Sequence, residues 1–308
     1  MNVSSYLQSF GRNIFLKENI SKLIHNKFIS TSISNPRFKS VKLSYSIFTP
    51  EEKPVSDPVI ILHGLLGSKQ NWRGLAKSIA RSSRCDVYAL DARNHGDSPH
   101  SEQFSYRLMA DDVKQFMKSQ EISQAVLIGH SMGGRTAMTV ALSEKGLVKK
   151  LVIVDVSPKK MPRSASAFIP SYMTTMKAAI ASIPSVGLVQ ARKMVDDYLS
   201  KYIPEFGIRQ FLLTNLVEKD NHIQWKPNID VLQDKFEQEI IEFPDLSETF
   251  TEDTLFICGG DSPYVKEQDY PYIRKLFPKA QFVVIPGAGH WVHSEKPAEF
   301  LDTVRNFL

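Results

Sequence analysis

The feature of this sequence that most constrains its fold is a regular alternation of short apolar runs with stretches of helical spacing. The apolar runs have strand length and carry few charges, which is typical of parallel strands covered on both faces. The segments between them repeat their apolar residues every three to four positions, as helices packed on a sheet do. The pattern therefore predicts an α/β fold with helices on both faces of a mostly parallel sheet. After an opening strand within residues 38–50, the apolar runs are VIILHG (59–64), CDVYALD (85–91), QAVLIGH (124–130), KLVIVDV (150–156), DTLFICGG (253–260) and QFVVIPG (281–287).

The alternation is interrupted once, by a long and mainly helical stretch at residues 157–245 that prolines punctuate. Strand and helix patterns resume after it. A chain of 308 residues is long enough for one large α/β domain with an insertion. We therefore predict a core made of residues 38–156 and 246–308, with 157–245 forming a helical cap inserted after the sixth strand.

The basic charge of the chain is concentrated in its first 40 residues. The net charge is +5, and residues 1–40 hold six basic side chains against one acidic side chain. The rest of the chain is therefore neutral overall, which argues against a nucleic-acid-binding surface on the folded part. No apolar run approaches the roughly 18 residues that a membrane-spanning helix needs, so no transmembrane segment is expected.

Residues 1–37 have the composition of an organelle targeting sequence. They are rich in serine and basic residues, poor in acids, and contain amphipathic turns. These properties are typical of mitochondrial transit peptides, and no secretory hydrophobic region is present. We interpret 1–37 as a mitochondrial-type transit peptide or flexible leader, and the first of these predicts a mitochondrial localisation. The alternative is an N-terminal extension without a targeting role.

The two cysteines give no sign of a disulfide framework or a metal site. Cys85 and Cys258 each lie in or beside a strand-like run and lack the spacing of metal-binding pairs. We interpret both as buried thiols. No nucleotide or flavin motif is present, so neither a cofactor nor a metal is expected.

A serine flanked by glycines occupies the junction between a predicted strand and a predicted helix. Gly129-His130-Ser131-Met132-Gly133 fits the pattern G-x-S-x-G in the context that this motif requires. A sharp turn there leaves no room for side chains two positions away from the serine. It also exposes the serine hydroxyl at a helix N-terminus, where a developing negative charge is stabilised. We predict that Ser131 is a nucleophile, and the alternative is a helix-capping serine beside packing glycines.

Two histidines follow the last predicted strand and compete for the role of general base. His290 comes directly after Gly-Ala-Gly, whose flexibility lets an imidazole lean over the end of the sheet. His293 precedes Ser294 and Pro297, which together predict a helix start. We therefore favour His290. A third histidine, His63, lies in a glycine-rich loop and is interpreted as structural.

These features resemble the α/β-hydrolase superfamily over roughly residues 40–308. The resemblance implies an eight-stranded, mostly parallel sheet with a helical cap, and a serine that attacks an acyl carbon while a histidine takes its proton. It also implies an oxyanion hole made of the N–H after the nucleophile and one N–H from the loop after the third strand. In this sequence those donors are Met132 and Leu65, the latter within HGLLGSKQNW (63–72).

Three aspartates at strand ends are candidates for the acid that orients the histidine. Asp91 precedes the serine and does not fit the order Ser…Asp…His. Most members of the superfamily place the acid after the seventh strand, commonly as Gly-x-x-Asp, and Asp261 falls one residue short of that spacing from Gly259. A minority place it after the sixth strand, where Asp155 ends LVIVD. From the residues alone, Asp155 and Asp261 both remain candidates.

A closer resemblance favours Asp155. The motifs HGLLGS…NW, DARNHGDSP, GHSMGG, VDVSP and GGDSPYV together resemble the α/β-hydrolase domain-containing protein 11 group, whose relatives include bacterial YbfF-type esterases and yeast ethanol acetyltransferases. In that group the acid after the sixth strand completes the triad, and the later position is an amide within Gly-Gly-Asn-Ser-Pro. This sequence departs from the group by having Asp261 there, so Asp261 stays the alternative acid.

The resemblance implies a serine hydrolase that cleaves carboxylic esters, or thioesters, of small or medium acyl groups through an acyl-enzyme on Ser131. The first alternative is an alcohol acyltransferase, in which ethanol rather than water resolves an acetyl-enzyme formed from acetyl-CoA. The second is a non-catalytic binding module, which an intact set of Ser131, Asp155 and His290 disfavours. The expected partner is a small-molecule acyl ester or thioester. Nothing in the sequence indicates an oligomeric state.

Overall fold

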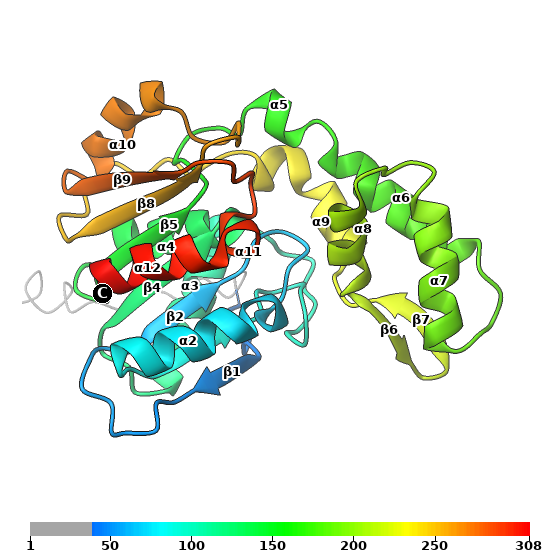
Figure 1. Ribbon diagram of the computed structural model, residues 1–308, viewed down its shortest axis with the longest axis horizontal. Coiled ribbons are helices and arrows are strands. Elements are labelled where there is room, and N and C mark those ends of the chain that lie inside the picture. The colour runs from blue at the N-terminus through cyan, green and yellow to red at the C-terminus, as the bar shows by residue number, and fades with distance from the viewer. Residues whose placement is uncertain (1–38) are drawn as a thin grey trace, which may run out of the picture. The chain divides into compact units, whose positions relative to one another are not determined.

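A mostly parallel sheet forms the centre of the protein in the computed structural model, which describes residues 39–308. The strands of this sheet are Tyr45–Phe48 (β1), Val59–Leu62 (β2), Val87–Leu90 (β3), Ala125–His130 (β4), Val148–Val154 (β5), Thr254–Gly259 (β8) and Ala280–Ile285 (β9). They follow the order β1-β3-β2-β4-β5-β8-β9 (Figure 1). The edge strand β1 pairs antiparallel with β3, and the other neighbouring pairs are parallel. The predicted α/β fold class is therefore confirmed, whereas the expected leader at 1–37 lies outside the described residues.

The sheet has seven strands within residues 39–308, one fewer than the eight expected. The seven strands correspond to the opening strand and the six apolar runs found in the sequence, so the eighth was an expectation from the family resemblance alone. The opening strand begins at Tyr45. Before it, the backbone N–H of Val41 donates to Asp112 Oδ1 at 2.7 Å, and that of Ser44 donates to Ser98 Oγ at 2.8 Å. Because side chains rather than a neighbouring strand accept these hydrogen bonds, this stretch does not extend the sheet.

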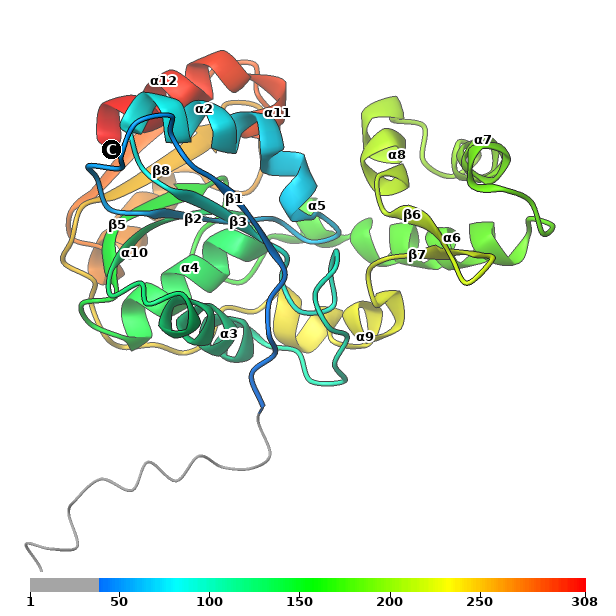
Figure 2. The same ribbon diagram turned by 90° about the horizontal axis from the view of Figure 1, so that it is seen from below.

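Helices cover both faces of the sheet. They are Arg73–Ser83 (α2), Tyr106–Ser119 (α3), Met132–Ser143 (α4), Tyr270–Leu276 (α10), Val292–Glu295 (α11) and Pro297–Phe307 (α12), with short 3₁₀ helices at Lys69–Trp72 (η2) and Glu267–Asp269 (η4). In β2, Val59 and Ile61 enter the hydrophobic cluster under α2 and α12, whereas Ile60 and Leu62 enter the cluster with α3 and α4. Figure 2 shows these two pairs of helices on opposite sides of the sheet. Burial on both faces explains why the strands are continuous apolar runs.

The chain leaves the sheet after β5 and returns at β8, and we call residues 155–253 between them the inserted segment. It follows the fifth strand along the chain and not the sixth, because the sheet has one strand fewer than expected. Its helices are Arg163–Ser166 (α5), Ile169–Ala181 (α6), Leu188–Leu199 (α7), Phe206–Leu213 (α8) and Ile229–Asp234 (α9), followed by a π-helix at Phe236–Ile240 (η3). Figure 1 shows α6, α7 and α8 grouped together to one side of the sheet.

An antiparallel hairpin interrupts the helices of the inserted segment, and the sequence analysis did not predict it. Its strands are Leu216–Lys219 (β6) and His222–Trp225 (β7). The two residues between them, Asp220 and Asn221, have φ of 53° and 62°. Two consecutive residues with positive φ form the tight turn that suits two antiparallel strands, and Asp and Asn tolerate this conformation. Strands of four residues are too short for their alternation to stand out from a helical pattern.

Candidate active site

Ser131 lies on the sharp turn that the G-x-S-x-G motif predicts. It separates β4 from α4 and has φ of 52° and ψ of −116°, a conformation that non-glycine residues rarely adopt. The flanking glycines have no room for a side chain. A Cβ on Gly129 would lie 2.3 Å from the Gly133 carbonyl oxygen, and one on Gly133 would lie 2.2 Å from that of Leu62. The sharp turn at Ser131 therefore requires glycine at positions 129 and 133.

A cavity of about 340 Å³ opens in front of Ser131. His290 and Trp291 line it from the loop after β9, and Leu65 lines it from the loop after β2. The inserted segment supplies much of the remaining wall, mostly through apolar and aromatic side chains. A concave, largely apolar site with a few convergent polar groups is the usual form of a small-molecule site.

His290 and Asp155 form a close pair at the edge of this cavity. His290 Nδ1 and Asp155 Oδ2 are 2.7 Å apart, and Asp155 is completely buried. The other carboxylate oxygen, Oδ1, accepts the backbone N–H of Gly259 at 3.0 Å. A carboxylate partner fixes the tautomer in which Nδ1 carries the proton, so Nε2 of His290 has a lone pair. This is the arrangement of a histidine prepared to accept a proton.

Asp261 does not reach the histidine. Its side chain is exposed to solvent, and its backbone N–H donates to the Ala288 carbonyl oxygen at 2.9 Å. Within residues 39–308, no hydrogen bond or ion pair joins the Asp261 carboxylate to His290. Of the two acids that the sequence left open, the structure brings Asp155 to the imidazole.

Two residues in the stretch GGDSPY contact the His290–Asp155 pair, and the sequence analysis assigned neither of them a role. Ser262 Oγ donates to Asp155 Oδ2, and the Tyr264 backbone N–H donates to Ser262 Oγ at 3.2 Å. The Tyr264 ring lies flat on the imidazole of His290, with ring centroids 3.6 Å apart. The sequence did carry a signal for Ser262, because it occupies the third position after Gly259, where most of the superfamily carries its acid.

The two predicted oxyanion donors come from separate elements, and Leu65 lines the same cavity as Ser131. Met132 begins α4 directly after Ser131, and Leu65 lies in a turn that the Gly67 N–H closes by donating to the Gly64 carbonyl oxygen at 3.0 Å. That carbonyl belongs to the same peptide unit as the Leu65 N–H. Because C=O and N–H of a trans peptide point in opposite directions, a carbonyl held inside the turn directs the Leu65 N–H outward.

His63 has a structural role beside this turn, as the sequence analysis interpreted it. Its Nδ1 lies 2.7 Å from the Gly64 carbonyl oxygen, and its Nε2 accepts the backbone N–H of Ala92 at 3.0 Å. Burial lowers the pKa of His63, so the ring stays neutral and both ring nitrogens serve the backbone.

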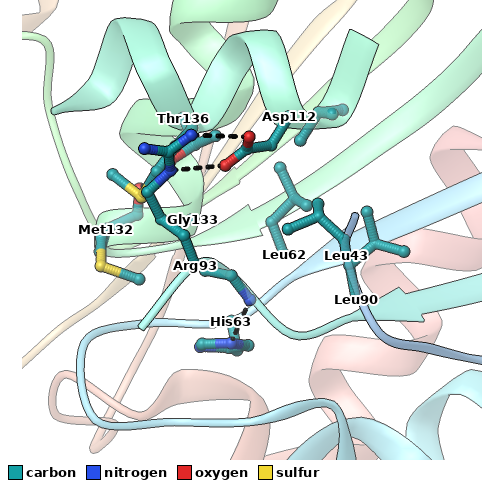
Figure 3. A pocket seen from close by; sticks show the side chains of 12 residues that line it. Leu43, Leu62, His63, Leu90, Arg93, Asp112, Met132, Gly133 and Thr136 are labelled. Carbon is teal, nitrogen blue, oxygen red and sulfur yellow. Dashed lines mark hydrogen bonds and ion pairs between the residues drawn. The ribbon is translucent and has the colours of Figure 1, made fainter. Parts of the chain in front are cut away.

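A second and much smaller cavity lies beside the first turns of α4 (Figure 3). It measures about 20 Å³, and His63, Met132 and Thr136 are among the residues that line it. Arg93 and Asp112 close one side with two charged hydrogen bonds of 2.6 and 2.7 Å. A space of this size has room for about one water molecule and not for an organic substrate. Substrate chemistry therefore belongs to the larger cavity in front of Ser131.

His293, the competing candidate for the base, is packed away from the cavity. Its ring stacks on Trp72 with centroids 4.2 Å apart and planes 3° from parallel. Burial lowers the pKa of His293 to about 3. Burial also lowers the pKa of its neighbour His130, whose Nε2 lies 2.9 Å from the His290 carbonyl oxygen. Both rings therefore stay neutral, and His130 packs between His293 and His290, with its ring centroid 4.7 Å from that of His290 and 4.6 Å from that of His293.

The described residues also bear on metal ligation and membrane insertion. Among residues 39–308, no group of three or more His, Cys, Asp or Glu side chains is arranged to hold a metal ion. Over the same range, no helix combines the length and the apolar character needed to cross a bilayer.

Comparison with known proteins places this geometry in a family. The sequence profile described as alpha/beta hydrolase fold matches residues 57–297. The chain belongs to the α/β-hydrolase family. The turn at Ser131 and the pairing of His290 with Asp155 both lie within the matched range.

Curated relatives of this α/β-hydrolase confirm the closer resemblance seen in its motifs. The mouse sn-1-specific diacylglycerol lipase ABHD11 is 42% identical over 280 residues, covering 91% of this chain and 89% of that protein. The Escherichia coli esterase YbfF is 32% identical over 270 residues, covering 87% of this chain and 99% of that protein. A probable alcohol acetyltransferase of Saccharomyces cerevisiae is 31% identical over 324 residues, covering 100% of this chain and 91% of that protein.

A solved structure resembles this α/β-hydrolase over most of its length. A marine microorganism esterase superposes with a TM-score of 0.78 at 35% sequence identity. The match covers 87% of this chain and 100% of the esterase.

Proposed function

We propose that this protein is a serine hydrolase that cleaves carboxylic esters through an acyl-enzyme on Ser131. The similarity to a lipase and two esterases supports an ester hydrolase as the general class. The observation that carries the proposal is the buried contact between His290 and Asp155 beside the cavity that Ser131 lines. A serine at a strained turn, a histidine base and an orienting carboxylate are the parts that acyl transfer requires.

In the proposed first half-reaction, Nε2 of His290 takes the Ser131 proton as Oγ bonds to the acyl carbon. The carbonyl oxygen becomes negatively charged and accepts hydrogen bonds from the backbone N–H groups of Leu65 and Met132. The imidazolium, stabilised by Asp155, then gives its proton to the leaving alcohol or thiol as the carbon–oxygen or carbon–sulfur bond breaks. The acyl group stays on Ser131 as an ester.

In the proposed second half-reaction, water replaces the departed alcohol. His290 takes one proton from the water as its oxygen bonds to the acyl carbon, and the same two N–H groups stabilise the oxyanion. The tetrahedral intermediate collapses when His290 returns a proton to Ser131 Oγ. The carboxylic acid leaves, and the enzyme is restored.

The cavity supports a substrate with a small or medium acyl group. Its volume of about 340 Å³ lies near the lower end of small-molecule sites. Phe168, Ile208 and Phe211 of the inserted segment and Trp291 of the core present apolar surface to it. We propose that residues 157–245 act as a cap whose helices bind the acyl chain by burying it against these side chains.

A second candidate function is alcohol acyltransfer, which the similarity to a yeast alcohol acetyltransferase favours. The acyl-enzyme would be the same, and an alcohol such as ethanol would replace water in the second half-reaction. The two functions differ in the product, because transfer gives a new ester and hydrolysis gives an acid.

One assay series tests the hydrolase proposal and separates it from acyltransfer. Purified protein would be given p-nitrophenyl esters and acyl-CoA thioesters of increasing chain length, with and without ethanol. We expect turnover that falls for the longest chains and yields mainly free acid, and we expect no turnover with Ser131→Ala. Ester as the main product would favour acyltransfer, and no turnover of any acyl donor would contradict both functions.

We also propose that residues 1–37 direct the protein to mitochondria. The proposal is supported only by their serine-rich, basic and acid-poor composition. Fusing these residues to a fluorescent protein should give mitochondrial fluorescence. Diffuse fluorescence would identify the segment as an extension without a targeting role.

A further inference from the structure

The turn that carries the proposed oxyanion donor Leu65 contains a disfavoured backbone conformation. The turn spans residues 64–67, and its third residue, Leu66, has φ of 59°. Glycine is the residue that normally occupies such a position, because a Cβ crowds the neighbouring carbonyl. A residue in this conformation persists only where its surroundings hold it in place.

Both backbone polar groups of Leu66 are held by side chains from elsewhere in the fold. Its N–H donates to His95 Nε2 at 3.1 Å, and His95 Nδ1 in turn lies 2.9 Å from the Arg93 carbonyl oxygen. Its carbonyl oxygen accepts a hydrogen bond of 2.7 Å from the side-chain Nδ2 of Asn215. His95 comes from the loop after β3, whereas Asn215 comes from the inserted segment. The turn is therefore fixed from two sides.

Asn215 is itself positioned firmly. It follows α8, is 1% exposed, and its carbonyl oxygen accepts the backbone N–H of Lys226 at 2.9 Å. Only the NH₂ group of the amide can donate to the carbonyl of Leu66, so the orientation of the side chain is determined by its partner. Removing the Asn215 donor would be costly, because the buried Leu66 carbonyl oxygen would have no water molecule to take its place.

We propose that Asn215 is a positioning residue for the oxyanion hole. By holding the Leu66 carbonyl it fixes the turn, and the turn fixes the direction of the Leu65 N–H one residue away. The inserted segment then contributes to stabilising the transition state in addition to walling the cavity. Because hydrogen bonds to an oxyanion depend steeply on distance and angle, a loosened turn lowers the rate of acylation more than it weakens substrate binding.

This inference rests on the proposed hydrolase function, and its test separates the two. The variants are Asn215→Leu, which has similar size and no donor, and Asn215→Asp, which turns an acceptor toward the Leu66 carbonyl. Asn228→Ala is the matched control. Asn228 is a second asparagine of the inserted segment whose side chain contacts a core loop, because its Nδ2 donates to Asn94 Oδ1 at 3.4 Å. It has no contact with the turn at 64–67 among the described residues.

The measurements are kcat and KM for an activated ester and the inhibition constant of a trifluoromethyl ketone, whose adduct with the serine places an oxyanion in the hole. For both Asn215 variants we expect kcat to fall roughly 10- to 100-fold with KM changed little, since a small misplacement of a catalytic group has effects of this size. The inhibition constant should rise in the same proportion, and Asn228→Ala should keep kcat within about twofold.

Three outcomes would overturn the inference. One is wild-type kcat in either Asn215 variant, and another is a lower kcat with unchanged affinity for the ketone, which would mean that the oxyanion hole is intact. An equal loss in Asn228→Ala would mean that the inserted segment acts only through its stability. If one Asn215 variant fails to fold, the other decides. A wild-type protein without turnover would overturn the proposed function, and with it this inference.

Discussion

Tyr264 lies flat against His290, with ring centroids 3.6 Å apart and ring planes 10° from parallel. Its hydroxyl donates to the carbonyl oxygen of Ala165 in the inserted segment at 3.1 Å. The imidazole is thus held at its edge by Asp155 and on its face by an aromatic ring that is fixed to the inserted segment. An aromatic face also stabilises a positive charge above it, which the imidazole acquires during proposed catalysis.

The stacked ring gives the first prediction. Tyr264→Leu removes the aromatic face and should lower kcat about 10-fold, which corresponds to ~1.4 kcal/mol of transition-state stabilisation. Tyr264→Phe keeps the face and loses only the hydrogen bond to Ala165, so its kcat should stay within about threefold of wild type. The measurement is steady-state hydrolysis of an activated ester. Equal losses in the two variants would show that the hydroxyl, and not the face, matters.

The choice of acid gives the second prediction. Asp155→Asn should lower kcat roughly 10⁴-fold, because an amide whose oxygen accepts the Gly259 N–H presents its NH₂ group, a donor, to Nδ1 of His290 and so favours the wrong tautomer. Asp261→Asn is the matched control and should behave like wild type, since its side chain is exposed. Both are measured by steady-state kinetics. A collapse of activity in Asp261→Asn with an active Asp155→Asn would reverse the assignment.

Ser262 gives the third prediction. Its hydroxyl donates to the oxygen of Asp155 that also binds His290, so it helps to fix the position of that carboxylate oxygen. Ser262→Ala should lower kcat by about 10-fold, the usual effect of losing one hydrogen bond to a charged group. Ser262→Thr retains the hydroxyl and should recover most of the activity. If Ser262→Ala has wild-type kcat, the hydroxyl has no part in orienting the pair.

How far the sequence could predict the site depends on whether the decisive contacts are local. The turn at Ser131 could be predicted because its steric cause lies within five residues, at Gly129 and Gly133. The carboxylate that pairs with His290 could not be identified from local sequence in this way. Asp155 and Asp261 follow the adjacent strands β5 and β8, and their roles depend on where each side chain points. The φ of 51° at Asp155 is a property of the folded backbone that no motif records.

The same distinction applies to the parts of the fold that the sequence missed. The hairpin β6–β7 consists of strands too short to show a period, whereas the seven strands of the sheet match the seven strand patterns of the sequence. The contact from Asn215 to Leu66 joins residues 149 positions apart. The residues around Asn215 and Leu66 do not predict this hydrogen bond, because it forms only when the inserted segment packs on the core.

Buried histidines give the fourth prediction, which concerns the pH dependence of stability. Burial lowers the pKa of both His95 and His293 to about 3. In the unfolded chain each would protonate near its usual pKa of about 6.5. Between these values the unfolded state binds more protons than the folded state, so the free energy of unfolding falls as the pH falls.

His293→Phe tests how much the protonation of His293 contributes to this pH dependence. Phenylalanine can keep the stack on Trp72 and removes an Nδ1 that has no partner among the described residues. We expect the dependence of the free energy of unfolding on pH to weaken by up to ~1.4 kcal/mol per pH unit between about pH 4 and pH 6. Urea unfolding followed by circular dichroism measures it. An unchanged slope would mean that His293 takes up no proton on unfolding.

The central claim is that Ser131 is the nucleophile, and covalent labelling tests it most directly. A fluorophosphonate reacts with a serine only where a base and an oxyanion hole activate it. Intact-mass measurement and peptide mapping after treatment should reveal one adduct per chain, located on Ser131, and no adduct on Ser131→Ala. An unlabelled wild-type protein, or an undiminished adduct on Ser131→Ala, would contradict the account.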